Sequence, residues 1–468
     1  MPESNDLMLG GLSPDEAERE IYQHIISRNP EHSFEPTLDR VRDVCALLGD
    51  PQHSYKVIHL TGTNGKTSTA RMAESLVREH GLRTGLFTSP HLTTVRERIQ
   101  IDGEPISQED FIRLWTEVAP IIHLVDAKSI KDGGPRLSFF EVLVVLAYAA
   151  FADTPVDVAV IEVGMGGVWD ATNVADGDVS VVTSVSMDHA QWLGNTLTEI
   201  ATEKAGIIKP GAASVIAEQA ESVLPVLYQA VDDNNARARW EGIDLEVVER
   251  QPGVGGQLVT LRTTAATYAD VFVPLYGAYQ ASNALLALAA VEALLADGGE
   301  VFALSGETVE AGFAAVTSPG RLEAVRTSPM VLVDAAHNSA GVDALVGALE
   351  ESFTFEALVG VVGILQDKDA EGILGGLEPA LDHVVLTASN SPRAIPVDEL
   401  AEIAIPIFGE DRVTVASSLP DALDQAVQIT ERDHDMGAGV LAVGSVTLIS
   451  EVRILMRADE RKGMGQAR

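Results

Sequence analysis

The fold is decided by the stretch Lys56-Val57-Ile58-His59-Leu60-Thr61-Gly62-Thr63-Asn64-Gly65-Lys66-Thr67. Residues 56–61 are mostly apolar and indicate a buried strand, whereas residues 67–80 carry apolar side chains at helical spacing and stop at Gly81. When a strand, a Gly-rich turn and a helix follow in this order, backbone N–H groups and the helix N-terminus can enclose phosphate oxygens. The stretch therefore predicts a nucleotide-binding loop, and an ordinary Gly-rich turn is the alternative.

The side chains of this loop fit ATP and Mg²⁺. Lys66 can reach the β- and γ-phosphates, and Thr67 can place its hydroxyl near the metal ion. The general pattern G-x-x-x-x-G-K-[ST] is not fully met, because Leu60 stands where the first Gly would be. We expect the nucleotide phosphates to be bound by Thr63, Asn64, Gly65, Lys66 and Thr67.

Outside the loop, strands and helices alternate. Short strands are expected at residues 84–88, 156–163 and 179–184, which predicts a mostly parallel α/β sheet. Residues 239–275 differ, because strands at 245–248 and 257–261 surround a Gly-rich turn and favour a small antiparallel subsheet. A long Ala/Leu-rich helix is expected from Ser282 to Ala296.

The alternation restarts after Ser318-Pro319-Gly320, which is the best candidate for a linker. Further strands are expected at 331–334, 358–362, 384–387 and 440–443. We predict an α/β protein of two domains. Residues 1–317 would form a P-loop, parallel-sheet ATPase domain with the antiparallel subsheet, and residues 318–468 a Rossmann-like α/β domain.

The composition excludes several classes of partner. Lys and Arg number 32 and Asp and Glu 69, which gives a net charge of 32 − 69 = −37. Such a surface repels nucleic acid and anionic membranes, so neither is expected as a partner. Cys45 is the single cysteine, the N-terminus lacks a basic and apolar leader, and the apolar run 142–152 is too short for a membrane span. We expect a soluble, cytoplasmic monomer that binds small molecules.

Ten segments resemble one known family. The loop at residues 61–67 resembles the phosphate loop of the Mur-ligase superfamily, which has this variant of the pattern. The others resemble folylpolyglutamate/dihydrofolate synthases and follow the family order from about residue 50 to about residue 455. They are residues 88–92 with 97–99, 138–141, 162–167 with 170–173, 188–189, 203–209, 319–323, 334–338, 367–369 and 392–394.

The resemblance implies an ATP-dependent carboxylate–amine ligase. A carboxylate of dihydropteroate or of a reduced folate attacks the γ-phosphate and becomes an acyl phosphate. The amine of L-glutamate then displaces phosphate and forms an amide. In such chemistry the protein mainly positions the reactants and neutralises their charge. The family resemblance implies two Mg²⁺ sites that contribute to this neutralisation.

Four residues are candidate metal ligands. Glu162 ends an apolar strand, where a carboxylate points into the usual ligand crevice of an α/β sheet. The resemblance assigns Glu162 and Ser89 to one Mg²⁺ and His189 to a second. An ammonium cannot bind a metal, but the family often carries N6-carboxylysine at the position of Lys204. The alternatives are a salt bridge, a turn before Pro90, a packed histidine and an unmodified lysine.

The resemblance also implies nucleotide contacts outside the loop. Asn283 would approach the adenine, Arg321 the phosphates, Asp334 the ribose and His337 the γ-phosphate, although His337 could equally be structural. Arg321, Asp334 and His337 lie in the second domain, so the site would close only when the domains meet and exclude water. The expected catalytic residues are Lys66, Lys204 and His337.

The acceptor and glutamate sites are expected in four segments. The resemblance places the pterin against Ser138, Phe139, Phe140, Glu141, Trp169, Asp170 and Ala171, where aromatic rings can stack and a carboxylate can accept N–H groups. Core packing is the alternative for Phe139 and Phe140. Lys368 and Arg393 could bind the incoming glutamate or phosphate, and solvated surface cations are the alternative.

Two residues depart from the family pattern, and two rival functions stay open. Val168 stands where the family usually has Arg, and Tyr279 where it usually has His. One rival is another amino-acid ligase of the superfamily, but only about 55 residues precede the loop, too few for the usual UDP-sugar domain. The other is a regulatory nucleotide switch, which needs neither a second metal site nor a reactive lysine.

Overall fold

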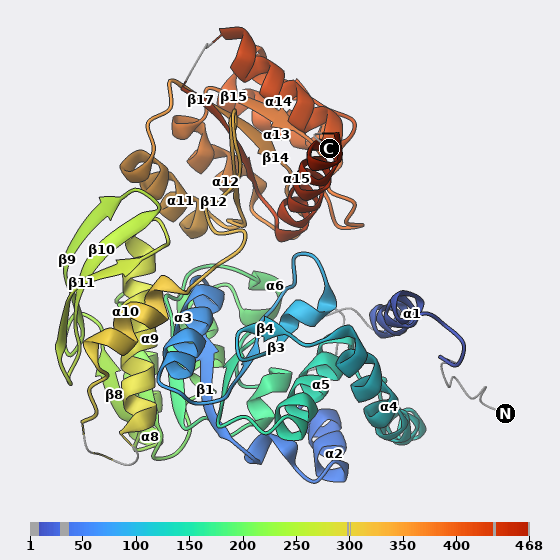
Figure 1. Cartoon of the computed structure of the whole chain (residues 1–468), viewed down its shortest axis with the longest axis vertical. Coiled ribbons are helices and arrows are strands. Elements are labelled where there is room, and N and C mark those ends of the chain that lie inside the picture. The colour runs from blue at the N-terminus through green and yellow to red at the C-terminus, as the bar shows by residue number, and fades with distance from the viewer. Residues whose placement is uncertain (1–8, 29–36, 297–298, 300, 434–436, 467–468) are drawn as a thin grey trace.

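Two α/β units follow one another along the long axis, and a small antiparallel sheet lies beside their junction (Figure 1). The structure is a computed structural model that describes residues 9–28, 37–296, 299, 301–433 and 437–466. The expected fold class is confirmed, with both larger sheets mostly parallel.

The first unit is built on an eight-stranded sheet in the order β4-β3-β2-β5-β1-β6-β7-β8. Neighbouring strands from β2 to β8 are parallel, and β3 and β4 continue one edge in antiparallel pairing. Because β1 lies between β5 and β6, the loop after β1 leaves the sheet at the carboxyl ends of its central strands, where α/β proteins bind ligands. The strands are β1 (Lys56–Thr61), β2 (Thr84–Phe87), β3 (Ile99–Ile101), β4 (Glu104–Pro105), β5 (Val158–Glu162), β6 (Val179–Val182), β7 (Ala213–Ile216) and β8 (Arg237–Trp240).

Helices cover both faces of this sheet. The expected long helix begins at Ala278, four residues earlier than Ser282, directly after Gly277, whose φ of +93° ends the preceding turn. The helices are α1 (Pro14–Ile26), α2 (Asp39–Leu47), α3 (Lys66–Glu79), α4 (Gln108–Lys131), α5 (Phe139–Asp153), α6 (Ala190–Leu193), α7 (Leu197–Ala205), α8 (Leu224–Asp233), α9 (Ala278–Leu295) and α10 (Gly306–Ala314), with short 3₁₀ turns η1 (Pro51–His53), η2 (Val95–Arg98) and η3 (Ala171–Val174).

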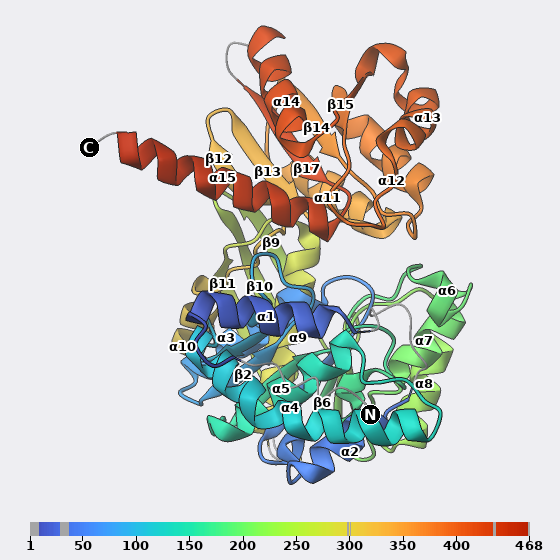
Figure 2. The same ribbon diagram turned by 90° about the vertical axis from the view of Figure 1, so that its right-hand side faces the viewer.

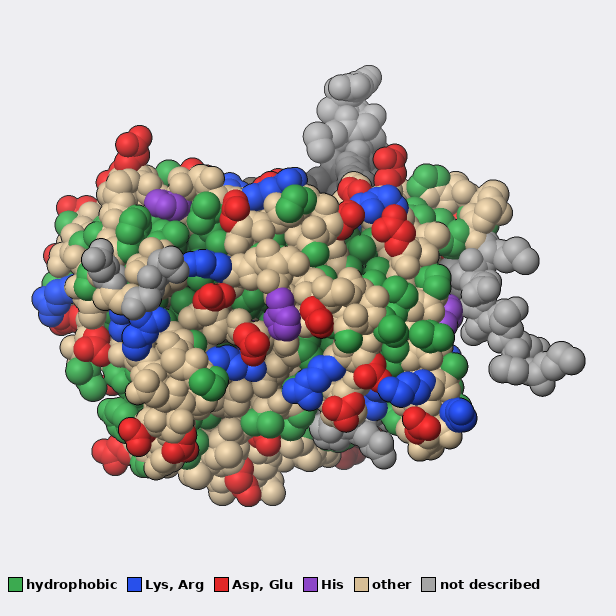
Figure 3. Space-filling view, turned by 90° about the horizontal axis from the view of Figure 1, so that it is seen from below, with side chains coloured by type: hydrophobic (Ala, Val, Ile, Leu, Met, Phe, Trp, Pro, Cys, Tyr) green, Lys and Arg blue, Asp and Glu red, His purple; other side chains and the backbone are tan. Residues whose placement is uncertain are grey.

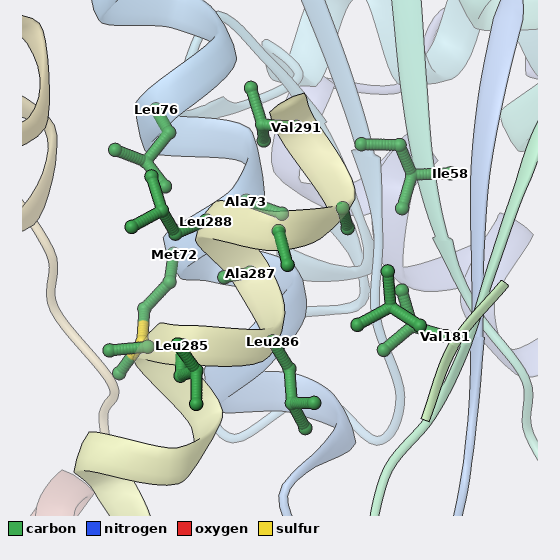
Figure 4. Packing of buried hydrophobic residues seen from close by; sticks show 14 of the residues in the cluster. Ile58, Met72, Ala73, Leu76, Val181, Leu285, Leu286, Ala287, Leu288 and Val291 are labelled. Atoms are coloured by element: carbon green, nitrogen blue, oxygen red, sulfur yellow. The ribbon is translucent and has the colours of Figure 1, made fainter. Parts of the chain in front are cut away.

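The helix α3, which follows the phosphate loop, is fixed by the packing of α9. Figure 4 shows Met72 of α3 and Ala287 of α9 within one apolar cluster, beside Ile58 of β1 and Val181 of β6. Among the described residues, α9 is long and apolar enough to cross a membrane by length and composition, but 72% of it is buried in the protein. We interpret it as a core helix that holds α3 against the sheet.

The small sheet beside the junction has the predicted antiparallel arrangement. Its three strands lie in the order β11-β10-β9, and a turn from Gly253 to Gly256 joins β9 to β10. The strands are β9 (Glu246–Gly253), β10 (Gly256–Arg262) and β11 (Thr267–Val273).

The second unit contains a six-stranded sheet in the order β12-β13-β17-β14-β15-β16. All pairs are parallel except β12 with β13. Figure 2 shows α15 along the side of this unit that faces the first. The elements are β12 (Glu323–Thr327), β13 (Met330–Asp334), α11 (Ser339–Ser352), β14 (Ala357–Val362), α12 (Ala370–Leu377), η4 (Glu378–Ala380), β15 (His383–Leu386), α13 (Val397–Phe408), η5 (Glu410–Arg412), β16 (Val413–Val415), α14 (Leu419–Asp433), β17 (Ala438–Val443) and α15 (Val446–Gln466).

We propose that the two units are the two expected domains, 1–317 and 318–468. The proposed boundary falls between α10, which packs against α3, and β12, the first strand of the second sheet.

The acidic surface does not form a continuous patch on the end of the first unit that faces away from the second. Figure 3 shows this end, where acidic and basic side chains are interspersed. A local site can therefore have a charge that differs from the net charge of the chain.

We predict that Leu288→Ala lowers the free energy of unfolding by about 2–5 kcal/mol, because it leaves a cavity in the core under α3. Leu288 is 0% exposed in that core. The midpoint of urea unfolding measures the effect, with Leu124→Ala as the control, since Leu124 is 61% exposed. Equal midpoints for the two variants would contradict the packing role of α9.

Candidate active site

A cavity of about 900 Å³ lies between the two units. Every residue that the sequence predicted for the site lines it, from the phosphate loop in the first unit to Lys368 and Arg393 in the second. Segments far apart in the sequence are thus brought together, but the role of each residue still depends on its contacts.

The phosphate loop is fastened to the segment that follows β6. The backbone N–H of Thr63 donates to the Ser184 carbonyl at 2.8 Å, and the Thr63 hydroxyl donates to the Ser186 carbonyl at 3.0 Å. The Thr183 hydroxyl donates to the Asn64 carbonyl at 2.7 Å. These contacts fix the loop in the shape that it needs for phosphate before any ligand binds.

Two lysine amines converge on the carbonyl oxygen of Gly62. Lys66 Nζ donates to it at 3.0 Å and Lys204 Nζ at 2.7 Å. Burial lowers the pKa of Lys66, and burial together with the nearby Lys66 lowers the pKa of Lys204 well below its usual range. The site therefore concentrates positive charge that an anion would stabilise, and it favours the uncharged amine of Lys204.

The residues expected around the first metal ion lie together. The Thr67 hydroxyl donates to Glu162 Oε1 at 2.8 Å, and the backbone N–H of Ser89 donates to Glu162 Oε2 at 3.2 Å. Burial raises the pKa of the Glu162 carboxyl, so a cation beside it would be favourable. A hydroxyl and a carboxylate are hard oxygen donors of the kind that Mg²⁺ prefers, so these residues fit the predicted ion.

The second metal site has less support from the geometry. Within the described part of the chain, no group of three or more His, Cys, Asp and Glu side chains gathers to hold a metal ion. Burial lowers the pKa of His189 to about 3, which leaves the neutral ring that a metal ligand requires. Its role and that of Lys204 as ligands stay predictions, and a carboxylated Lys204 would add the missing oxygens.

The expected adenosine and phosphate contacts lie on the side of α9 and β13. The Asn283 amide donates to Gln280 Oε1 at 3.0 Å. Asp334 accepts the backbone N–H groups of Leu322 at 2.7 Å and Ala336 at 2.8 Å, so it also shapes the turn that carries Arg321. Each carboxylate oxygen keeps a further lone pair for a ribose hydroxyl.

His337 and Lys368 of the second unit both face Asp188 of the first. Lys368 Nζ lies 2.6 Å from Asp188 Oδ1, and His337 Nε2 lies 3.4 Å from Oδ2. The Lys368 side chain is 7% exposed, so the alternative of a solvated cation is wrong for it. Arg393 pairs with Asp367 at 3.3 Å, and its side chain is 42% exposed.

In the expected pterin segment, two polar residues have structural contacts. The Ser138 hydroxyl accepts the backbone N–H of Glu141 at 3.2 Å, and the Glu141 carboxylate accepts that of Ser138 at 2.6 Å, which forms a capping box for α5. Glu141 also binds the buried Arg40 at 3.1 Å. Phe139 and Phe140 line the cavity, so both a pterin contact and core packing remain consistent with their positions.

Asp170 shapes the loop after β5. It accepts the backbone N–H groups of Met165 and Thr172, both at 2.9 Å, and the Thr172 hydroxyl. Burial raises the pKa of Asp170 to about 6. Trp169 and Ala171 flank it on the cavity wall.

Three residues that the sequence did not assign connect α1 to this wall. Arg98 Nε donates to His91 Nδ1 at 3.0 Å, and the Tyr22 hydroxyl lies 3.3 Å from His91 Nε2. The Arg98 guanidinium lies 5.0 Å from the centre of the Phe139 ring. The only signal in the sequence was that His91 and Arg98 belong to segments resembling the family.

The two departures from the family pattern have different surroundings. Val168 is 45% exposed and is not among the residues that line the cavity, whereas Tyr279 lies on the cavity wall beside Gln280 and Asn283. Tyr279 is therefore the departure that can touch a ligand.

The chain matches known proteins along most of its length. Residues 129–291 match the Mur ligase middle domain and residues 320–446 the Mur ligase, glutamate ligase domain. The dihydrofolate synthase/folylpolyglutamate synthase of Mycobacterium tuberculosis is 46% identical, and the alignment covers 93% of each chain. The crystal structure of M. tuberculosis folylpolyglutamate synthase with ADP and AMPPCP has a TM-score of 0.90 at 45% identity and covers 95% of this chain and 99% of that one. An FPGS–AMPPCP–folate complex has a TM-score of 0.81 at 30% identity, with 94% and 99% covered.

We predict that Gly62→Ala weakens ATP binding at least about tenfold, or about 1.4 kcal/mol. Gly62 has a φ of +145°, and an added Cβ would lie 1.8 Å from the Thr183 hydroxyl oxygen and 3.1 Å from the Thr183 carbonyl carbon. Titration calorimetry with ATP measures the change. Gly81→Ala is the control, because Gly81 also has a positive φ, +95°, but open space around it. An unchanged ATP affinity for Gly62→Ala would show that this loop does not hold the nucleotide.

Proposed function

This chain belongs to the Mur ligase superfamily, in the family of dihydrofolate and folylpolyglutamate synthases, and from this premise we propose how its site performs the ligation. The protein is an ATP-dependent acid–amino-acid ligase that joins L-glutamate to folate species. The acceptors are tetrahydrofolate and its polyglutamates, and dihydropteroate. The close relatives carry both folate activities in their names, which speaks against another amino-acid ligase of the superfamily.

The observation that carries this proposal is the shared cavity. The phosphate loop, the cations of the second unit and the aromatic segment around Phe139 line one space. An acceptor carboxylate can therefore lie between the γ-phosphate and the groups that would receive glutamate. Holding reactants in this way supplies much of the rate of a phosphoryl transfer.

In the first step an acceptor carboxylate oxygen attacks the γ-phosphorus, and the bond to the β-phosphate oxygen breaks, which yields an acyl phosphate and ADP. Lys66 lies at the phosphate loop, and His337 and Arg321 approach the same cavity from the second unit. We propose that these three cationic or N–H-bearing side chains stabilise the charge on the transferred group.

In the second step the uncharged amine of L-glutamate attacks the acyl carbon. An amide forms, inorganic phosphate leaves, and the nitrogen loses a proton. Lys368 and Arg393 are the candidates for binding the carboxylates of the incoming glutamate, because they supply cations at the second-unit side of the cavity. Closure of the two units would keep water from the acyl phosphate.

Mg²⁺ would neutralise phosphate charge when it is bound. We propose that Thr67, Ser89 and Glu162 hold one ion, and that His189 and a carboxylated Lys204 hold a second. Each proposed ligand lines the cavity next to the phosphate loop.

We propose that Lys204 is carboxylated to N6-carboxylysine. Lys204 is 4% exposed, its amine lies 2.7 Å from the Gly62 carbonyl oxygen, and its lowered pKa favours the neutral amine that attacks CO₂. The nitrogen bonds to the CO₂ carbon and loses one proton, so a buried neutral amine becomes an anion beside Lys66. The charge of Lys66 is then compensated instead of repelled.

The proposed acceptor site stacks the pterin against Phe139, Phe140 and Trp169, with Asp170 and Ala171 at its edge and the capped end of α5 beneath it. We further propose that the enzyme works as a cytoplasmic monomer, since all proposed site residues come from one chain.

We predict that Lys66→Ala lowers kcat for ligation at least about a hundredfold, because it removes a preorganised cation from the transferred phosphate. Mass spectrometry of the products, heavier by one glutamate unit, measures the loss with tetrahydrofolate and with dihydropteroate. Lys131→Ala is the control, since Lys131 is an exposed lysine at the end of α4. Near-normal product formation by Lys66→Ala would refute the phosphate-loop mechanism.

We predict that Lys204→Ala loses activity and partly regains it when acetate or another short carboxylic acid is added, because the acid restores the carboxylate of the carbamate. Lys66→Ala should gain nothing from the same acids, since it lacks a cation. The readout is kcat against acid concentration, together with the intact mass of the wild-type peptide. No rescue and an unmodified wild-type mass would rule out the carboxylated lysine.

A further inference from the structure

We propose that Asp188 is the positioning residue that holds Lys368 and His337 over the phosphate loop when the two units close. This inference rests on the ligase function proposed above and adds a residue to which no role has been given so far. Asp188 lies in the segment after β6, whereas Lys368 and His337 both belong to the second unit.

The segment that carries Asp188 is hydrogen-bonded to the phosphate loop. Ser186 lies two residues before Asp188. The Ser186 carbonyl accepts a hydrogen bond from the Thr63 hydroxyl, and the Ser186 N–H donates to the same hydroxyl, both at 3.0 Å. The side-chain amide of Asn64 donates to the Ser186 hydroxyl at 3.3 Å. The position of Asp188 is therefore defined relative to the bound phosphates.

From the other side, three side chains of the second unit meet the Asp188 carboxylate. Lys368 Nζ lies 2.6 Å from Oδ1, and Oδ2 has Asn338 Nδ2 at 3.2 Å and His337 Nε2 at 3.4 Å. The side chains of Asp188 and Lys368 are only 8% and 7% exposed. Within its own segment, Asp188 Oδ1 accepts the backbone N–H of His189 at 2.8 Å, and His189 Nε2 lies 3.8 Å from Oδ2.

Asn338 fixes the position of the second unit relative to the phosphate loop. Its side-chain oxygen accepts the N–H of Gly341 at 2.8 Å and so caps α11, and its amide exchanges hydrogen bonds with that of Asn64, both at 3.2 Å. The start of α11 is thus docked on the phosphate loop itself. Lys368 and His337 reach the loop on the same surface and share Asp188 with Asn338.

The energetic consequence is a preference for the closed arrangement. Removing one partner of a buried ion pair leaves a charge with neither partner nor water. Opening the units would hydrate Asp188, Lys368 and His337 separately and withdraw both second-unit side chains from the substrates. Through Asp188, closure of the two units therefore also brings Lys368 and His337 to the reacting atoms.

A second ion pair between the units supplies a matched control. Arg250 of β9 pairs with Glu351 of α11 at 2.7 Å, with side chains 19% and 37% exposed. Neither residue lines the cavity. Glu351→Gln removes an ion pair that bridges to the same second unit without touching the site.

The first test compares the kinetics of Asp188→Asn, Asp188→Glu and Glu351→Gln with those of the wild type. Asp188→Asn should lower kcat for ligation about a hundredfold, as expected when reacting groups are displaced by about 1 Å, while KM for ATP stays near the wild-type value. Asp188→Glu keeps the charge and should recover part of kcat. Glu351→Gln should retain wild-type kcat.

The second test measures closure directly. Gln229→Cys in α8 and Glu402→Cys in α13 place one exposed thiol in each unit, and the buried Cys45 stays unlabelled in the folded protein. Energy transfer between dyes at these thiols, with Mg²⁺ and AMPPCP, should report closure in the wild type and in Glu351→Gln. Asp188→Asn should show a smaller closed population.

The outcomes separate the two proposals. A wild type that ligates, with an Asp188→Asn variant of unchanged kcat or unchanged closure, would overturn the role of Asp188 and leave the ligase function intact. An equal loss of kcat and of ATP affinity would overturn it as well, because that result reports a damaged phosphate loop. A wild type that forms no product would instead refute the proposed function.

Discussion

The site depends on one electrostatic constraint, the convergence of two lysine amines on the carbonyl oxygen of Gly62. Lys66 Nζ and Lys204 Nζ lie 3.0 and 2.7 Å from this oxygen, and Lys204 is buried whereas Lys66 is half-buried. Two cations cannot share such a place without compensation, so at least one must be neutral or meet an anion. The phosphates of ATP meet this requirement for Lys66, and a carbamate would meet it for Lys204. The positive charge at the phosphate loop is thus compensated only when anionic groups are bound there.

The same constraint explains why a chain of net charge −37 can bind anionic substrates. Charges of both signs are interspersed on the end of the first unit that Figure 3 shows, and the cavity lining also carries both signs, with Lys66 and Lys204 at the phosphate loop. The phosphate loop contributes Lys66 through α3, whose position depends on the packing of α9. The second unit contributes Lys368, and the contacts of Asp188 of the first unit and Asn338 of the second hold this unit against the loop. In the proposed mechanism, activation of a carboxylate and protection of the acyl phosphate would both follow from the approach of the two units.

Sequence reasoning reached the fold class, the antiparallel subsheet and the phosphate loop, because the apolar runs of the central strands and the Gly-rich loop are local signals, whereas most of the other site candidates came from the family resemblance. It missed β3, β4 and β16, which have two or three residues each and too few apolar side chains to show a period, and it also missed the longer strands β7, β8, β11 and β12. It also missed the contacts of Asp188 with Lys368 and of Glu141 with Arg40, since these join residues 180 and 101 positions apart. The alternative of a solvated cation for Lys368 failed for the same reason: burial by a distant segment leaves no trace in the sequence around it.

The most direct test of the account is the stoichiometry of ADP release to glutamate addition, measured on the purified protein with Mg-ATP and L-glutamate. Dihydropteroate and tetrahydrofolate are supplied in turn as acceptors, and the products are weighed by mass spectrometry. The account predicts one ADP for each glutamate unit added to either acceptor, and almost no ADP when glutamate or the acceptor is omitted, because the closed cavity protects the acyl phosphate from water. ADP release without a heavier product would contradict it.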